Sequence, residues 1–131
     1  YFGWATAKLD DFVNFIPARI SALILLLSAL AQGQNEAKRS FLAIRLDSSK
    51  MDSINSGYPE SAMAGALNIK LAGPRQYGNQ NFDYEWIGGA NEGSTDQVTI
   101  KHIRESLFIY TKALLILAAI LTFVTTWITN H

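Results

Sequence analysis

Residues 107–129 read LFIYTKALLILAAILTFVTTWIT, and Lys112 is the only charged residue in this run. An α-helix needs about 20 predominantly apolar residues to cross the hydrocarbon core of a bilayer. The run meets that requirement, so it predicts a membrane helix over about 107–129. We expect this helix to begin upstream, near Asp96 or Thr99, and to continue through the apolar run without a break.

A second apolar run, FIPARISALILLLSALA, covers residues 15–31, with Arg19 as its only charge. It predicts a second membrane helix over about 15–32, preceded by a short amphipathic segment. Pro17 is expected near the start of this helix, where proline is tolerated. Because the run is short, two alternatives stay open: a broken or re-entrant membrane helix, and a buried helix of a soluble domain.

These two runs define the expected fold class. The sequence predicts an all-α protein, a multi-pass integral membrane fragment with two membrane helices. A long polar loop, partly helical and partly irregular, joins them over about 33–106. The chain begins with Tyr1 instead of methionine, and two spans offer little surface for a core of their own. We therefore expect residues 1–131 to be one part of a longer membrane domain.

The distribution of lysine and arginine orients the expected spans. Segment 32–106 holds most of these residues, residues 1–14 hold only Lys8, and none follows Thr129. Because basic residues concentrate in cytoplasmic loops, we expect loop 33–106 on the cytoplasmic side of the cell (inner) membrane.

Composition excludes several classes of site. The 11 basic and 11 acidic residues balance, so the chain lacks the basic excess typical of a nucleic-acid partner. There is no cysteine, which excludes thiolate metal sites, and the two histidines alone disfavour a zinc site. The sequence contains no P-loop, nucleophile elbow or dinucleotide fingerprint.

Within the polar loop, residues 55–67 read NSGYPESAMAGAL. They predict a turn followed by a helix of small residues over about 59–70, because proline and an acidic residue suit a first helical turn. A further helix is expected over 35–47. Residues 75–96 are rich in Asn, Gln, Gly and aromatic residues without periodicity, which predicts a long irregular loop.

The 55–67 run has two interpretations. Small residues at this spacing serve close packing between helices. Alternatively, the start of the helix forms an anion or substrate site, with Glu60 as a metal ligand or a base. Asp10, Asn14 and Arg19 are spaced to share one helix face, where Arg19 either extends toward the membrane surface or forms an ion pair or phosphate clamp. If residues 15–31 cross the membrane fully, Asp10 and Asn14 lie opposite the 55–67 run.

The order of several motifs resembles the CobD/CbiB family of cobalamin biosynthesis, the adenosylcobinamide-phosphate synthases. The 55–67 run is similar to the family signature, and so are other elements in the same order: Asp10-Asp11 with Asn14, Ile16-Pro17-Ala18-Arg19, Leu71-Ala72-Gly73, Tyr77-Gly78 and Trp86-Ile87-Gly88. The chain departs from the family pattern at Tyr58, where tryptophan is usual, and at Gly89, where aspartate is common. The resemblance covers nearly the whole chain but only the C-terminal part of a typical member.

The resemblance implies an ATP-dependent amide ligase that attaches aminopropanol or its phosphate to adenosylcobyric acid. It implies ATP and Mg²⁺, a corrinoid substrate, membrane lipid and other late-step cobalamin enzymes as partners. Glu60 and Arg19 are the expected catalytic residues, with Glu60 binding Mg²⁺ or accepting the amine proton. The expected substrate-binding residues are Asp10, Asn14, Asn55, Ser56, Gly57, Tyr77 and Trp86. A non-catalytic membrane scaffold that presents corrinoids and a corrinoid transporter are the rival functions, and the isolated fragment is expected to be inactive.

Overall fold

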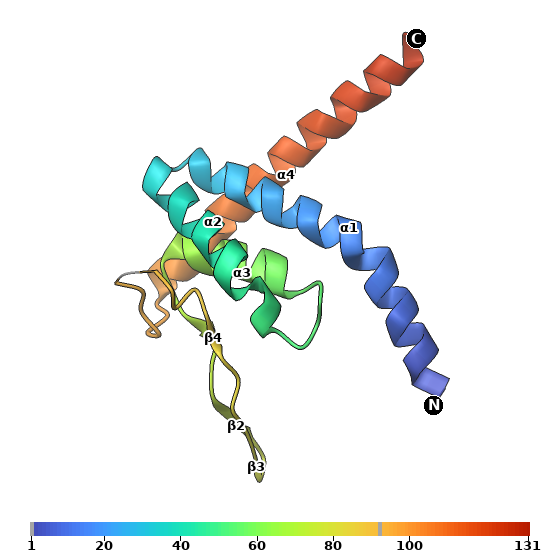
Figure 1. Cartoon of the computed structure of the whole chain (residues 1–131). Coiled ribbons are helices and arrows are strands. Elements are labelled where there is room, and N and C mark those ends of the chain that lie inside the picture. The colour runs from blue at the N-terminus through green and yellow to red at the C-terminus, as the bar shows by residue number, and fades with distance from the viewer. Residues whose placement is uncertain (1, 92) are drawn as a thin grey trace.

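Two long helices, α1 (Phe2–Leu30) and α4 (Ile100–Thr129), contact and cross each other (Figure 1). The computed structural model describes residues 2–91 and 93–131, without the side chains of Phe2 and Tyr77. Between the long helices the chain forms α2 (Gln34–Asp47), the short 3₁₀ helix η1 (Ser48–Lys50) and α3 (Gly57–Leu67). The described residues are therefore mostly helical, as the sequence predicts.

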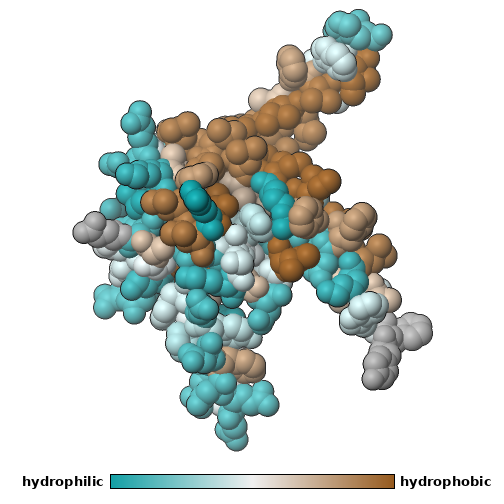
Figure 2. Space-filling model, viewed as in Figure 1, coloured by the Kyte–Doolittle hydropathy of each residue, from teal (hydrophilic) through white to brown (hydrophobic). Residues whose placement is uncertain are grey.

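Helix α4 confirms the prediction made for the last helix. Thr99 is its N-cap, and its backbone N–H donates to Nδ1 of His102 at 3.1 Å. Helices α1 and α4 are both long and apolar enough to cross a membrane, judged by length and composition alone. Hydrophobic residues gather over both helices, whereas hydrophilic residues gather around the strands (Figure 2).

Helix α1 differs from the prediction, because Pro17 lies inside one helix that already begins at Phe2. An interior proline removes a backbone hydrogen bond and usually costs about 3 kcal/mol. Tertiary contacts hold the helix on both sides of Pro17. The Asn55 amide donates to the Asp11 carbonyl, and Arg19 donates to the Asn55 amide oxygen, each at 2.9 Å. The amphipathic segment before the apolar run is helical, but it continues into that run as one helix instead of ending before it.

Small residues let α2 and α3 approach closely. A Cβ atom on Gly65 would lie 2.5 Å from the Arg39 carbonyl oxygen and 2.7 Å from the Ser40 Cα. The Ser40 hydroxyl donates to the Ala62 carbonyl at 2.9 Å, and both residues are fully buried. Helix packing is thus the role of the small residues of the 55–67 run on this face of α3.

The core lies where α1, α3 and α4 meet. Ala29, Ala66 and Ile109 are buried together there, one from each helix. The Lys112 ammonium donates to the Ala31 carbonyl at 3.1 Å, just beyond the end of α1, and lies over the ring of Phe108. A cation at this position also stabilises the negative end of the α1 dipole.

Residues 71–87 correct both the expected irregular loop and the purely α-helical class. Strand β1 (Leu71–Ala72) pairs antiparallel with β4 (Trp86–Ile87), and β2 (Arg75–Tyr77) pairs with β3 (Gln80–Phe82). Gly78 has φ 58° in the two-residue connection of this second hairpin, a conformation that glycine adopts without strain. The paired hairpin extends away from the helices (Figure 1).

The first turn of α2 contains a carboxylate that should make stability depend on pH. A hydrogen bond from the backbone N–H of Glu36 lowers the pKa of its carboxyl group; burial opposes this, and Arg39, 3.1 Å away, contributes to the lowering. The stabilisation is therefore present above the ordinary pKa of about 4.5 and is lost as the pH falls through the lowered value.

We expect Glu36→Gln to lower the melting temperature at pH 7 and to have a smaller effect at a pH below the lowered pKa, where the wild-type carboxylate also takes up a proton. Thermal unfolding in detergent at the two pH values measures the difference. Glu105→Gln, at an exposed pair with Lys101, is the matched control. An equal loss for Glu36→Gln at both pH values would contradict the prediction.

Candidate functional site

Arg19 joins the middle of α1 to the turn that precedes α3. Its Nη1 atom donates to the Phe15 carbonyl and to Oδ1 of Asn55, both at 2.9 Å, and Nη2 donates to the Ile54 carbonyl at 3.3 Å. The guanidinium lies 3.5 Å from the ring centroid of Phe15 and 4.1 Å from that of Tyr58. The Arg19 guanidinium thus makes three of its five possible hydrogen bonds within the protein. Two N–H groups are left for a ligand.

Asn55 is buried and uses both ends of its side-chain amide. Oδ1 accepts from Arg19, and Nδ2 donates to the Asp11 carbonyl, each at 2.9 Å. The orientation of the amide is fixed chemically, because the opposite one would face a donor with a donor and an acceptor with an acceptor. Asn55 therefore positions Arg19 and the turn.

The same region forms a cleft of about 330 Å³ between α1 and the turn. Asp10 and Asn14 line it from α1, where the Asn14 amide donates to the Asp10 carboxylate at 2.9 Å, and Ser56 lines it from the opposite side. A full membrane span over residues 15–31 would separate Asp10 and Asn14 from Ser56. The structure brings them to one cleft, because the turn before α3 lies against the middle of α1.

Gly57 lies at the start of α3 but belongs to the packing of the turn. A Cβ atom there would lie 2.0 Å from the Ser48 carbonyl oxygen, so only glycine allows the two backbones to meet. Gly57 is buried. Of the predicted Asn55-Ser56-Gly57 anion turn, Asn55 and Ser56 line the cleft and Gly57 does not.

Glu60 points to a different space, a groove of about 580 Å³ between α1, α3 and α4. The groove is mainly apolar, with walls that include Ile24, Met63 and Leu114. Glu60 is half-buried, and its carboxylate makes no hydrogen bond or ion pair within the described part of the chain. Ser21 and Pro59 line both this groove and the Asn14 cleft, so the two spaces are neighbours.

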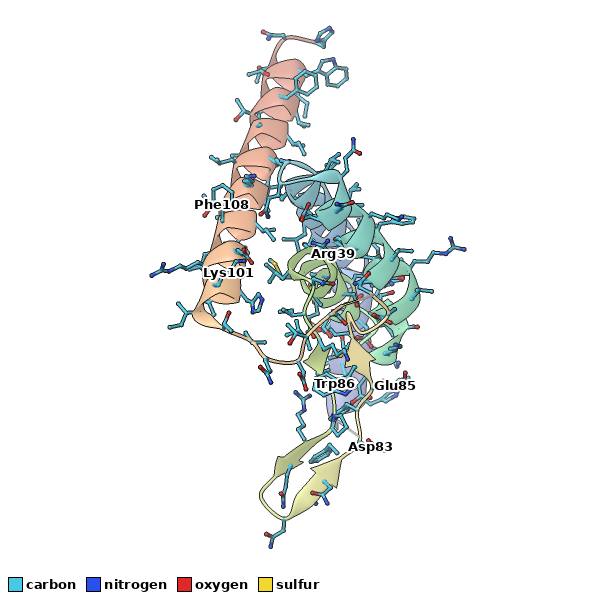
Figure 3. The ribbon with its side chains drawn as sticks, turned by 90° about the vertical axis from the view of Figure 1, so that its left-hand side faces the viewer. Arg39, Asp83, Glu85, Trp86, Lys101 and Phe108 are labelled. Atoms are coloured by element: carbon cyan, nitrogen blue, oxygen red, sulfur yellow. The ribbon has the colours of Figure 1, made fainter. Side chains whose placement is uncertain are left out.

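Trp86 lies in a third space, an open cleft of about 520 Å³ at the base of the hairpin (Figure 3). This cleft shares no lining residue with the Asn14 cleft or the Glu60 groove. Trp86 is 38% exposed. The side chain of Tyr77, the other aromatic residue of the expected site, lies outside the described residues.

Several residues of these spaces were not singled out from the sequence as site residues. Tyr58 stacks on Arg19, and Tyr110 lines the Glu60 groove from α4. Asp47 is fully buried, accepts the Gly88 N–H at 2.7 Å and lies 2.7 Å from the Lys50 ammonium. Except for the Asp47–Lys50 pair, these contacts join residues far apart in the chain, so no local pattern indicates them.

Replacing Asn55 with alanine should lower the free energy of unfolding by about 2 kcal/mol, because it removes an acceptor from a charged group and a donor from a buried carbonyl. Denaturant or thermal unfolding in detergent measures this loss. Asn14→Ala is the matched control, since the Asn14 amide bonds only the exposed Asp10 side chain. Equal stability of the two variants would contradict the positioning role of Asn55.

Comparison with known proteins gives one family. The model described as CobD/Cbib protein matches residues 1–110. The curated Cobalamin biosynthesis protein CobD of Pelobacter propionicus is 45% identical over 86 residues, covering 66% of this chain and 26% of that protein. The protein of the same name from Rhizobium meliloti is 44% identical over 91 residues, 69% of this chain and 28% of its own length.

A relative from Brucella anthropi, also named Cobalamin biosynthesis protein CobD, is 39% identical over 100 residues, 74% of this chain and 31% of that protein. The chain thus spans about a quarter to a third of the length of these relatives. No solved structure matches the chain.

Proposed function

The chain belongs to the CobD/Cbib protein family, and from that premise we propose that the intact protein acts in cobalamin biosynthesis as an ATP-dependent amide ligase. In this proposal it joins aminopropanol, or its phosphate, to a side-chain carboxylate of adenosylcobyric acid. The product is adenosylcobinamide or its phosphate. The named relatives support the pathway, and the residues around Glu60 support the type of reaction.

One observation carries the enzymatic proposal: a half-buried carboxylate without a partner lies directly beside a polar cleft. Amide formation requires the amine nitrogen to attack an activated carboxyl carbon, the activating group to leave and the nitrogen to lose a proton. A positioned carboxylate can accept that proton. We assign this role to Glu60, because Ser21 and Pro59 line both its groove and the Asn14 cleft.

The polar cleft supplies groups for the anionic and hydroxyl parts of the substrates. Arg19 provides positive charge beside it, with two N–H groups left for a phosphate or carboxylate. Asp10, Asn14 and Ser56 line the cleft and offer hydrogen bonds to an amino alcohol. Asn55 and Gly57 hold the turn in place, so in this proposal they act by positioning Arg19 and Ser56.

The protein itself offers Mg²⁺ few ligands at Glu60. Among the described residues, Glu60 is the only carboxylate that lines its groove, and no group of three His, Cys, Asp or Glu residues among them is placed to hold a metal. Mg²⁺ usually keeps several waters and is held by one or two carboxylates together with substrate phosphates, so Glu60 would serve as one ligand of a nucleotide-bound ion. We assign Glu60 to proton transfer and derive no step through a metal there.

The proposal also covers the location of the protein. The length and apolar character of α1 and α4 support a multi-pass protein of the cell (inner) membrane, with lipid around the exposed apolar side chains. Residues 33–106 are then cytoplasmic, where ATP, the corrinoid and other late-step enzymes have access. Because Asp10 and Asn14 share a cleft with Ser56, residues 15–31 in this proposal do not separate them by a full span.

The deciding experiment uses the purified intact protein in detergent with ATP, adenosylcobyric acid and either aminopropanol or its phosphate. We expect adenosylcobinamide or its phosphate by liquid chromatography, formed only when ATP is present. Corrinoid binding without any product would overturn the ligase and favour the scaffold. Corrinoid uptake by vesicles containing the protein, again without product, would favour the transporter.

A further inference from the structure

The cleft beside Trp86 contains two lysines in very different surroundings. The Lys50 ammonium lies 2.7 Å from the buried Asp47 carboxylate, donates to the Trp86 carbonyl at 3.3 Å and lies 3.8 Å from Glu85. Its charge is thus compensated, and it fixes the backbone of the cleft. Lys70 also lines the cleft and is half-buried, but its ammonium has no hydrogen bond or ion pair among the described residues.

Lys70 and the indole form one wall. A Cβ atom on Gly89 would lie 3.5 Å from Trp86 Cβ and 3.9 Å from Lys70 Cε, so both side chains flank this glycine. The other side of the indole packs against Gly73, where a Cβ atom would lie 2.5 Å from the ring carbons. The ring is therefore held in place while 38% of the residue stays exposed to the cleft.

From this arrangement we propose that the Trp86 cleft binds a flat ring system that carries an anionic group. The ring lies against the indole, and the anionic group pairs with the Lys70 ammonium. Stacking on an aromatic side chain and a charge-assisted hydrogen bond are the two contacts such a ligand needs. The cleft volume of about 520 Å³ lies within the usual range for small-molecule sites.

The acidic residues limit where the anion lies. Glu85 lies 3.8 Å from Lys50, and its side chain is 72% exposed, so solvent screens most of its charge. Asp83 also lines the cleft, nearer the tip of the hairpin than Trp86 (Figure 3). The anionic group therefore occupies the Lys70 end. The inference rests on the proposed function, which offers two ligands of this chemistry: the nucleoside triphosphate and the corrinoid with its free carboxylate.

Two variants test the proposal on the intact protein in detergent. Lys70→Ala removes the charge. Lys70→Glu puts a negative charge in its place on a side chain that lines the cleft. Lys101→Ala is the control, because Lys101 is 79% exposed and lies far from this cleft in Figure 3. Equilibrium dialysis with ATP, and separately with adenosylcobyric acid, gives the Kd values.

We expect both Lys70→Ala and Lys70→Glu to raise the Kd of one of these ligands by about tenfold, as loss of a charge-assisted hydrogen bond does, while Lys101→Ala changes neither Kd. The ligand affected identifies the occupant. Changes below about twofold for both ligands in both variants, with unchanged thermal unfolding, would overturn the inference.

The result separates this inference from the proposed function. If the wild-type protein forms the amide and both variants keep the wild-type KM for ATP and adenosylcobyric acid, the subsite is wrong and the ligase stands. If binding depends on Lys70 but no amide forms, the ligase is wrong and the subsite stands.

Discussion

Replacing Glu60 with glutamine should lower the rate of amide formation by about 10²- to 10⁴-fold, the usual contribution of a positioned acid or base. Glutamine has nearly the same shape but cannot take a proton from the attacking amine. The loss should fall on kcat, with little change in the KM for ATP. Steady-state assays of the intact protein with varied ATP and varied amine measure both parameters.

A pH series distinguishes proton transfer from a structural role of Glu60. At higher pH a larger fraction of the free amine is already unprotonated, so the deficit of Glu60→Gln should shrink as the pH rises. Glu105→Gln, an exposed carboxylate paired with Lys101, should keep the wild-type rate. Wild-type kcat in Glu60→Gln, or a deficit independent of pH, would place the base elsewhere.

Replacing Gly65 with alanine should destabilise the protein by about 3 kcal/mol, at the upper end of the usual range for overpacking. The added methyl group would meet the Arg39 carbonyl oxygen at 2.5 Å and the Ser40 Cα at 2.7 Å. Both contacts are with backbone or near-backbone atoms, so no side chain can rotate to relieve them. Helix α2 must move away from α3, which exposes the buried small residues between them.

Gly3→Ala is the matched control, because no other atom lies within 4 Å of a Cβ at Gly3. Alanine has the higher helix propensity, so this variant should be neutral or slightly stabilising. Thermal unfolding followed by circular dichroism in the same detergent compares the two. If Gly65→Ala melts with the wild type, the close approach of α2 and α3 does not exist in the folded protein.

Local patterns predict the helices well where the signal lies within the segment. Helix α4 begins after Thr99, as expected, and α2 over Gln34–Asp47 nearly coincides with the predicted 35–47. Each backbone hydrogen bond in a helix joins residues four apart, so the sequence of the segment contains most of the information. The predicted 59–70 helix occurs as Gly57–Leu67 and ends where Asn68 adopts the left-handed conformation.

Local sequence patterns do not predict pairings between segments that are distant in the chain. Leu71 pairs with Ile87, which makes a strand of a two-residue segment with no periodicity of its own. Pro17 predicts a helix start, yet contacts from Asn55 and Arg19 help to hold an unbroken helix around it. In both cases a tertiary contact decides against the local preference.

The sequence by itself determined the helical, apolar character of the chain, its family and the residue types of the site, because these are written in local composition and motif order. Only the tertiary structure decided which of those residues meet. It joined Arg19 to Asn55, brought Asn14 and Ser56 to one cleft, and placed Trp86 in a separate one. Chain connectivity alone does not determine the distance between residues that are tens of positions apart. The packing of the helices against one another determines it.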